Sequence, residues 1–397
     1  MIKSKISFIC TAAILLIITS CSGRQGADAG LISINYKELT DKGTVNLSDL
    51  FEEPEFIALD SRSPEAYATG GINISEQHIG ISSGYYQGNP YKLYDRATGK
   101  YLGTVGNVGR GPGEYLYLLG SFIDEKNNRI WLHDRPDVLH VYDLGTRQFV
   151  EDVPLAYNLG DYNYSKSAFT IDPEAGLITC ARVPYPEDSD TTAAWQQDFK
   201  GNVIWSVSER GMSMASTNIE AISQWGILSN RNIPGSLDIS FNTFNAAEDT
   251  LFIAENGALR PVFTMDLGKK AGTSTDVQMI AISLALQDKI LTDIQAPQPM
   301  KNGVVTFGSS ATVITDRRSG EAYRCTIVND YLGTGKCSPQ PSGGYLIQSY
   351  DPALFRETAS TALEEGRLSD SAKDRIRTIL SGLSDEDNNI IAIYKLR

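Results

Sequence analysis

Short apolar stretches separated by glycine-, asparagine- and aspartate-rich turns run through most of the chain, and five segments share one order of features. In each, an apolar strand is followed by an aspartate, a turn that contains glycine and a second strand. An aspartate side chain accepts hydrogen bonds from the backbone that follows it, so each aspartate is expected to open a turn. The aspartates are Asp95, Asp143, Asp198, Asp266 and Asp316, and the segments are residues 92–105, 139–153, 195–207, 262–270 and 312–327.

The aspartates are 48, 55, 68 and 50 residues apart, which indicates a repeat larger than a hairpin. A four-stranded blade of a β-propeller takes about 40 to 50 residues, and insertions lengthen it. A β-sandwich with coincidental hairpins is the alternative, because sandwiches also space short strands regularly. Further β-branched and aromatic runs, as expected for antiparallel sheets, precede four segments, at residues 129–134, 176–180, 250–254 and 303–307.

The two ends of the chain supply a sixth unit. Residues 55–60, 344–349 and 390–397 are strand-like but have no partner in their own neighbourhoods. Pairing of the last run with the first would close a ring and protect both sheet edges. The sequence therefore predicts an all-β fold, a six-bladed β-propeller over residues 45–397 that is closed by its N- and C-terminal strands.

One short helix is expected just before the last strand, on the outside of the ring or on one face. Residues 277–294 fit both the helical and the strand period, and their class stays open. Ser369 or Asp370 is available as the N-cap of the expected helix, in which apolar residues recur at helical spacing, at Ile376, Ile379, Leu380 and Leu383.

The N-terminus has the pattern of a secretory signal. Lys3 and Lys5 precede an apolar run over residues 6–18, which is shorter than the roughly 20 residues of a membrane-spanning helix. The run ends in Ile18, Thr19, Ser20 and Cys21. This ending resembles the lipobox of bacterial lipoproteins, and the resemblance implies lipidation of Cys21; an ordinary cleavable signal is the alternative.

This resemblance divides the chain into three parts. Residues 1–20 are the expected lipoprotein signal peptide, residues 21–44 the lipidated cysteine and a flexible, Gly/Ala/polar tether, and residues 45–397 the propeller. The expected location is the cell envelope, with a lipid anchor in the outer membrane. Asp28 is the one acidic residue close after the cysteine, and the periplasmic face and the cell surface both stay open.

The cysteines allow two interpretations. An exported domain tolerates disulfides, and Cys325 and Cys337, 12 residues apart, could pair, which would leave Cys180 free. Alternatively, the three are separate buried residues, because free cysteine is among the most buried residue types.

Charge and histidine content limit the partners. The formal net charge of −13 disfavours nucleic acid and anionic lipid headgroups as partners. With only three histidines in the chain, no histidine metal site is predicted: His133 and His140 are expected as polar rim residues, and His78 lies in another blade. No cofactor is predicted, although an oxygen-ligand calcium site in the central channel stays open because carboxylates are abundant, among them Asp124, Glu125, Asp134 and Asp137.

One glycine-rich stretch invites comparison with a phosphate-binding loop. Such a loop must lead into a helix, whereas here Leu116, Tyr117 and Leu118 follow. We therefore expect a structural loop in which the three glycines permit positive φ, Arg110 pairs with Glu114 and Tyr115 packs between blades; a ligand-binding role is the alternative. The stretch consists of Gly109, Arg110, Gly111, Pro112, Gly113, Glu114 and Tyr115.

Four stretches together resemble the six-bladed β-propeller lipoproteins common in Bacteroidetes, which are related in architecture to NHL-repeat propellers. They are residues 109–115, 249–268, 329–335 with Pro339, and 387–397. Asn389 departs from the pattern, because proline is usual at its position in the terminal stretch. The resemblance implies the propeller fold and an exported location.

The function that follows from these features is that of an anchored binding or scaffolding module for a protein, small-molecule or saccharide ligand. The alternative is a metal-dependent hydrolase or lyase of the lactonase-like six-bladed class, with one divalent cation in the channel. The sequence contains no HExxH motif, and no catalytic residue is predicted.

Overall fold

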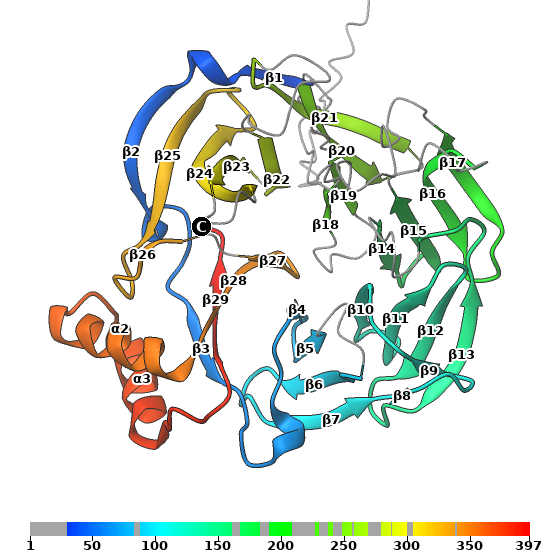
Figure 1. The fold of residues 1–397 in the computed structure, drawn as a ribbon, viewed down its shortest axis with the longest axis horizontal. Coiled ribbons are helices and arrows are strands. Elements are labelled where there is room, and N and C mark those ends of the chain that lie inside the picture. The colour runs from blue at the N-terminus through cyan, green and yellow to red at the C-terminus, as the bar shows by residue number, and fades with distance from the viewer. Residues whose placement is uncertain are drawn as a thin grey trace, which may run out of the picture.

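A ring of six blades, each a sheet of at least four strands, forms the body of the protein (Figure 1). The computed structural model describes residues 30–82, 88–160, 167–182, 190–208, 227–229, 237–240, 248–255, 258–268, 279–286, 288–299, 305–337 and 340–397. This arrangement confirms the predicted all-β propeller and excludes the sandwich.

Three blades consist of four consecutive antiparallel strands each. Blade 1 is β4 (Gly71–Ile74), β5 (His78–Ser82), β6 (Tyr91–Asp95) and β7 (Tyr101–Val105). Blade 2 is β10 (Gly120–Asp124), β11 (Arg129–Arg135), β12 (Val138–Asp143) and β13 (Phe149–Pro154). Blade 3 is β14 (Ser167–Asp172), β15 (Leu177–Arg182), β16 (Thr192–Asp198) and β17 (Val203–Ser208).

Blades 4 and 5 each gain an outer, parallel strand from the N-terminal segment. Blade 4 consists of β18 (Ile227–Ser229), β19 (Leu237–Ser240), β20 (Glu248–Glu255) and β21 (Ala258–Asp266). The N-terminal β1 (Ile32–Asn35) pairs with β21. Blade 5 consists of β22 (Met279–Ala285), β23 (Lys289–Pro299), β24 (Val305–Asp316) and β25 (Ala322–Asn329). The strand β2 (Thr40–Asn46) pairs with β25. Residues 277–294, whose class was open, thus contribute to β22 and β23.

Blade 6 closes the ring as predicted. It contains β27 (Gln340–Ser342), β28 (Tyr345–Tyr350), β29 (Ile390–Lys395) and β3 (Glu55–Ala58). The C-terminal β29 lies antiparallel to the N-terminal β3, with Ile390 opposite Ala58 and Ile393 opposite Glu55. Short pieces complete the strands, namely β26 (Gly335–Lys336) on β25 and the pair β8 (Asn107–Val108) and β9 (Glu114–Tyr115).

The repeated aspartates open turns, as expected. The carboxylate Oδ1 of Asp95 accepts a hydrogen bond from Thr98 N at 2.8 Å, and Asp143 accepts one from Thr146 N at 2.7 Å; Asp198 and Asp316 act in the same way. Asp266 also caps its turn, but the described outer neighbour of β21 is β1, not a strand that follows the turn. The second strand predicted after Asp266 extends into residues 269–270, outside the described residues.

Two helices, which follow β28 and precede β29 in the chain, pack on the outside of blade 6 (Figure 1). The expected helix is α3 (Asp370–Gly382), and its N-cap is Ser369, whose side chain accepts from Ala372 N. A second helix, α2 (Pro352–Glu365), was not predicted; it begins after the Asp351 cap and ends at Gly366 in a left-handed conformation. Three 3-10 turns, η1 (Tyr36–Glu38), η2 (Leu47–Asp49) and η3 (Pro64–Ala66), link the N-terminal strands.

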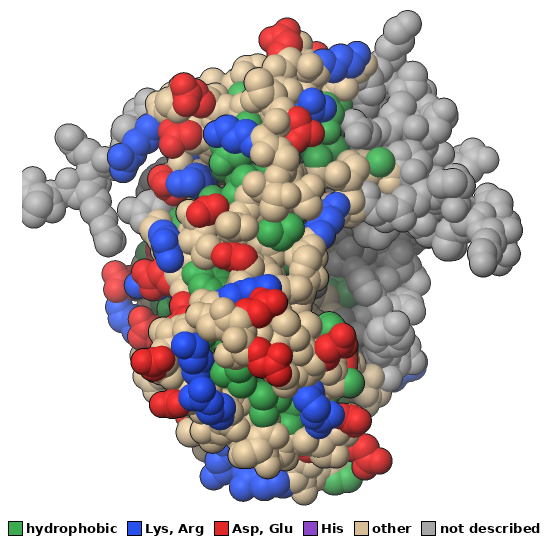
Figure 2. Space-filling view, turned by 90° about the vertical axis from the view of Figure 1, so that its left-hand side faces the viewer, with side chains coloured by type: hydrophobic (Ala, Val, Ile, Leu, Met, Phe, Trp, Pro, Cys, Tyr) green, Lys and Arg blue, Asp and Glu red, His purple; other side chains and the backbone are tan. Residues whose placement is uncertain are grey.

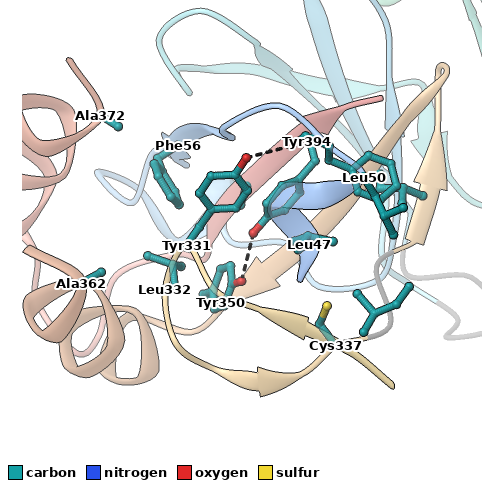
Figure 3. Close-up of a cluster of buried hydrophobic side chains, with 14 of the residues drawn as sticks. Leu47, Leu50, Phe56, Tyr331, Leu332, Cys337, Tyr350, Ala362, Ala372 and Tyr394 are labelled. Atoms are coloured by element: carbon teal, nitrogen blue, oxygen red, sulfur yellow. Dashed lines mark hydrogen bonds between the residues drawn. The ribbon is translucent and has the colours of Figure 1, made fainter. Parts of the chain in front are cut away.

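The apolar core is divided into clusters, most of which lie between neighbouring blades. In the cluster of Figure 3, Ala362 of α2 and Ala372 of α3 face Phe56 of β3, and Tyr331, Tyr350 and Tyr394 lie beside them. On the side of the molecule shown in Figure 2, lysine, arginine and acidic side chains are interspersed without a large patch of one sign. Within the described residues, none of the helices is both long and apolar enough to span a bilayer.

Candidate functional site

The inner turns of four successive blades line one hollow of about 510 Å³. It is lined by the β4–β5, β10–β11 and β27–β28 turns and by Pro173 of the β14–β15 turn. The innermost strands of a propeller surround its axis, so the hollow lies at one mouth of the central channel, and we name it the mouth pocket. Its volume falls within the roughly 300–1,000 Å³ typical of small-molecule sites.

Glu125 is the most firmly held carboxylate of the mouth pocket. Its Oε1 accepts hydrogen bonds from Ser75 Oγ at 2.6 Å and Gln77 N at 2.8 Å, and lies 2.6 Å from His78 Nδ1. Burial raises the pKa of Glu125, but the hydrogen bonds from Ser75, His78 and Gln77 outweigh burial and hold the pKa below its usual value. Glu125 is therefore a fixed, ionised group that also joins blade 2 to blade 1.

The other charges of the mouth pocket leave it negative. Glu76 is exposed at the rim, whereas Lys126 forms an ion pair with Glu174 at 2.6 Å. Asp124 is used within its own turn, where its carboxylate accepts from Asn127 N and Nδ2, each at 3.0 Å. The carboxylates best placed for a ligand are thus those of Glu76 and Glu125.

An aromatic wall completes the mouth pocket. Tyr345 of β28 lines it, and the guanidinium of the buried Arg96 lies over the Tyr345 ring at 4.5 Å. Arg96 also pairs with Glu55 of β3 at 3.2 Å and donates to Ser75 O at 3.0 Å. Blades 6 and 1 are thereby fixed relative to each other beside the pocket.

The structure does not bring the four carboxylates named for calcium into one site. Asp124 and Glu125 line the mouth pocket, whereas Asp134 and Asp137 lie at the opposite end of β11, in and beside the β11–β12 turn. Across the described ranges, no group of three or more His, Cys, Asp or Glu side chains is arranged to hold a metal ion.

The prediction that His133 and His140 are rim residues is wrong, because both are buried in blade 2. The ring nitrogens of His140 lie 2.8 Å from Asp134 Oδ1 and 2.5 Å from Asp152 Oδ1. Burial lowers the pKa of His140, but the two carboxylates outweigh it and raise the pKa. Burial lowers the pKa of His133 to about 4. His78, by contrast, belongs to the mouth pocket through Glu125.

The glycine-rich stretch 109–115 forms the connection from blade 1 to blade 2, and two details differ from expectation. Gly113 has positive φ (66°), but Gly109 and Gly111 do not; at Gly109 a Cβ would lie 2.0 Å from Glu114 Oε2. Glu114 accepts from Gly111 N at 2.8 Å, and the described ion pairs include none between Arg110 and Glu114. Arg110 and Pro112 are exposed.

Tyr115 packs between blades, as expected. Its hydroxyl donates to Val105 O at 2.5 Å and accepts from Tyr91 N at 2.8 Å. Tyr142 of blade 2 donates to Gly113 O at 2.9 Å. These contacts tie the stretch to both blades.

A second stretch singled out in the sequence, residues 329–335, ties blade 5 to blade 6. Asn329 Nδ2 lies 2.8 Å from Gln348 Oε1, 2.9 Å from Tyr350 Oη and 2.8 Å from Tyr394 Oη. Neither this buried network nor the partners of Glu125 were predicted from the sequence. Their sequence separations of 19 to 65 residues leave no local signal.

The cysteine predictions have different outcomes. Cys180, Cys325 and Cys337 are free and buried, so the structure does not contain the suggested bridge between Cys325 and Cys337. Cys325 and Cys337 belong to the same apolar cluster, which agrees with the interpretation as buried apolar residues. Cys21 lies outside the described residues.

Comparison with known proteins gives a family and a fold. The model of a family described as "Domain of unknown function (DUF4934)" matches residues 31–395, and no curated protein matches. A Bacteroides fragilis protein that is named as an exported protein is similar in structure, with a TM-score of 0.57 and 14% identity over 92% of this chain and 99% of that one. A Bacteroides vulgatus member of the DUF4221 family has a TM-score of 0.47 and 9% identity over 88% of this chain and 98% of that one.

Proposed function

The chain belongs to the family described as domain of unknown function DUF4934, and we propose that it is an exported, lipid-anchored propeller that binds its ligand in the mouth pocket without catalysis. The ligand carries a positively charged amine or guanidinium group. No observation on the described residues favours the hydrolase or lyase alternative.

The proposal rests on the fixed carboxylate of Glu125. Three donors from blade 1 hold one of its oxygens, so a ligand meets a charge that is already oriented, and little side-chain entropy is lost on binding. Glu76 adds a second negative charge at the rim, and the Tyr345 ring, on which Arg96 packs, lines the pocket beside them. A cationic group would pair with these carboxylates in a partly desolvated site.

Export and anchoring are supported by the sequence and by one relative. Residues 1–20 have the pattern of a lipoprotein signal with Cys21 at its end, and the similar Bacteroides fragilis protein is named as exported. Replacement of Cys21 by alanine is expected to release the protein from membrane fractions or to leave it unprocessed. Unchanged processing and membrane association of that variant would contradict the anchor.

The binding proposal can be tested by calorimetric titration of the purified chain with putrescine and with arginine amide. We expect both to bind, with affinity that falls as salt is added, and Glu76→Gln to weaken binding at least threefold. Glu65→Gln is the matched control, because Glu65 is an exposed glutamate in η3, remote from the pocket lining. Absence of binding by the unmodified chain, or equal binding by Glu76→Gln, would overturn the proposal.

A further inference from the structure

A second hollow lies between blades 6 and 1, at the other end of β4. Two cavities of about 130 and 320 Å³ share Ala68, Thr69 and Ile81 in their linings and so form one groove, which we name the clasp groove. Gly70 and Ile72 line it near the start of β4, whereas Ile74 and Ser75, at the end of β4, line the mouth pocket. The two sites therefore open on opposite faces of the ring.

The lining of the clasp groove combines an apolar floor with an uncharged polar rim. Leu59, Ile81 and Ile391 are at most 3% exposed and form the floor. The rim carries hydroxyl and amide side chains from four parts of the chain, and an aromatic ring, 41% exposed, stands at one end. The rim residues are Tyr67, Thr69, Asn89, Ser349 and Asn389.

Among the described residues of the lining, two are charged, and both hold the walls of the groove. Lys92 Nζ donates to Tyr67 O, and burial lowers the pKa of Lys92. Asp351 accepts from Leu354 N at 3.0 Å as the cap of α2. Recognition in the clasp groove thus falls mainly to neutral hydrogen-bonding groups.

Buried side chains beneath the rim keep it in place. Asn388 Nδ2 donates to Ala66 O at 2.7 Å, and Tyr94 Oη donates to the same carbonyl. Asn389 Nδ2 donates to Ser349 Oγ at 2.8 Å, so the turn that leads into β29 is tied to β28 in one wall. Since Asn388 is 3% exposed and Tyr94 fully buried, the wall that carries Tyr67 is built into the core.

We propose that the clasp groove binds a neutral saccharide. A pyranose ring has a C–H face, which fits an apolar floor and an aromatic ring, and a rim of hydroxyls, which pair with amide and hydroxyl side chains. The volume of the larger cavity, about 320 Å³, lies at the lower end of the range of small-molecule sites. This site is independent of the mouth pocket in position, lining and ligand chemistry.

The test is titration of the purified chain with maltotriose, cellotriose and chitotriose, measured by calorimetry and by native mass spectrometry. We expect at least one of them to bind with Kd below about 1 mM. Tyr67→Ala and Thr69→Val should each weaken that binding at least fivefold, because the first removes the ring and the second only the hydroxyl.

Two matched controls separate the clasp groove from other surfaces. Phe149→Ala removes an aromatic side chain of similar exposure, 36%, from β13, and Glu76→Gln alters only the mouth pocket; neither should change saccharide binding. Melting temperatures of all variants identify any that fail to fold, and Thr69→Val is expected to have the same melting temperature as the unmodified chain. Lack of binding to all three trisaccharides, or binding that Tyr67→Ala and Thr69→Val leave intact, would overturn the proposal, as would preferential binding of an uncharged tripeptide such as acetyl-trialanine amide.

Discussion

Blades 4 and 5 differ from blades 2 and 3 in how their outer edges end. The edges of β21 and β25 are covered by the parallel strands β1 and β2, whereas no strand of the described chain pairs with the outer edge of β13 or β17. Exposed apolar side chains mark these open edges, at Phe149, Val150, Val203 and Ile204. An open edge strand is a site for unwanted pairing.

The difference shows how the N-terminal segment is used. On its way to the closing blade it covers two edges in succession, and Leu47, Leu50 and Phe51 then enter the cluster beneath blade 6 (Figure 3). Blades 4, 5 and 6 are therefore stabilised by segments from the chain ends, namely β1 and β2 on blades 4 and 5 and the pair β3 and β29 in blade 6. Blades 2 and 3 gain no such strand within the described chain and are held by contacts with their neighbouring blades, as in the clusters shared by blades 1 and 2, 2 and 3, and 3 and 4.

The largest effect is expected when blade 6 loses β29, the strand that closes the ring. Truncation before Asn389 removes β29, which lies between β28 and β3, together with the buried Ile390, Ile391 and Tyr394. Two sheet edges open and the cluster beneath α2 and α3 loses its centre, so cooperative unfolding should be lost. Differential scanning calorimetry measures this, and an unchanged melting temperature would contradict the role of β29 in closure.

The second effect tests how blade 2 holds its open edge. His140 of β12 lies between Asp134 of β11 and Asp152 of β13, so a buried imidazole links the three outer strands of blade 2. His140→Gln should destabilise the protein by about 3 kcal/mol, because the buried Asp134 loses its closer partner and is left with Arg135, whose Nε lies 3.6 Å from Asp134 Oδ1. Asp152→Asn is the milder comparison, since the Asp152 side chain is 42% exposed.

The same cluster predicts a pH dependence whose sign follows from the pKa of His140. That pKa is raised in the folded state above its ordinary value of 6.5, so the folded state binds the proton more tightly. The stability from His140 is fully present below pH 6.5 and is lost as pH rises through the folded pKa. Chemical denaturation across this window should show the decline in the unmodified chain and a smaller one in His140→Gln; equal slopes would exclude His140 as the cause.

The sequence predicted the elements whose signals are local. The Asp-turn pattern located the blade turns, and the apolar run of β29 indicated the closing strand. The cover strand β2 escaped notice because six of its seven residues are exposed, so it has no apolar period. The helix α2 was missed because alanines provide half of its buried face.

Side-chain partners between blades could not be predicted in the same way. Glu125 meets Ser75, Gln77 and His78 only because blades 1 and 2 place their inner turns side by side. The burial of His133 and His140 likewise depends on what packs over β11 and β12. Within residues 109–115, glycine content alone suggested three positive-φ positions, where the structure has one.

A third effect compares two glycines in the connection that packs against the open edge of blade 2. Gly113 has a φ of 66°, and a Cβ there would lie 2.2 Å from Cγ of Phe149 on β13. Gly111 lacks positive φ, and its Cβ would lie 3.0 Å from the flexible Glu114 Oε2. Gly113→Ala should therefore cost about 2 kcal/mol and Gly111→Ala less than about 1 kcal/mol. Urea unfolding measures both, and equal costs would contradict this account of the loop.

A final pair of variants, one of which has the smallest expected effect, gives the most direct test of covered against open edges, because it uses one substitution in two places. Val262 of β21, under β1, is 5% exposed, whereas Val203 of β17 is 41% exposed. Val262 packs in the same cluster as Ile34 and Tyr36 of the N-terminal segment, so Val262→Ala removes buried carbon and should cost about 2 kcal/mol. Val203→Ala should change the unfolding free energy by less than about 0.5 kcal/mol. Similar losses in urea unfolding for the two variants would mean that the edge of blade 3 is covered as fully as that of blade 4.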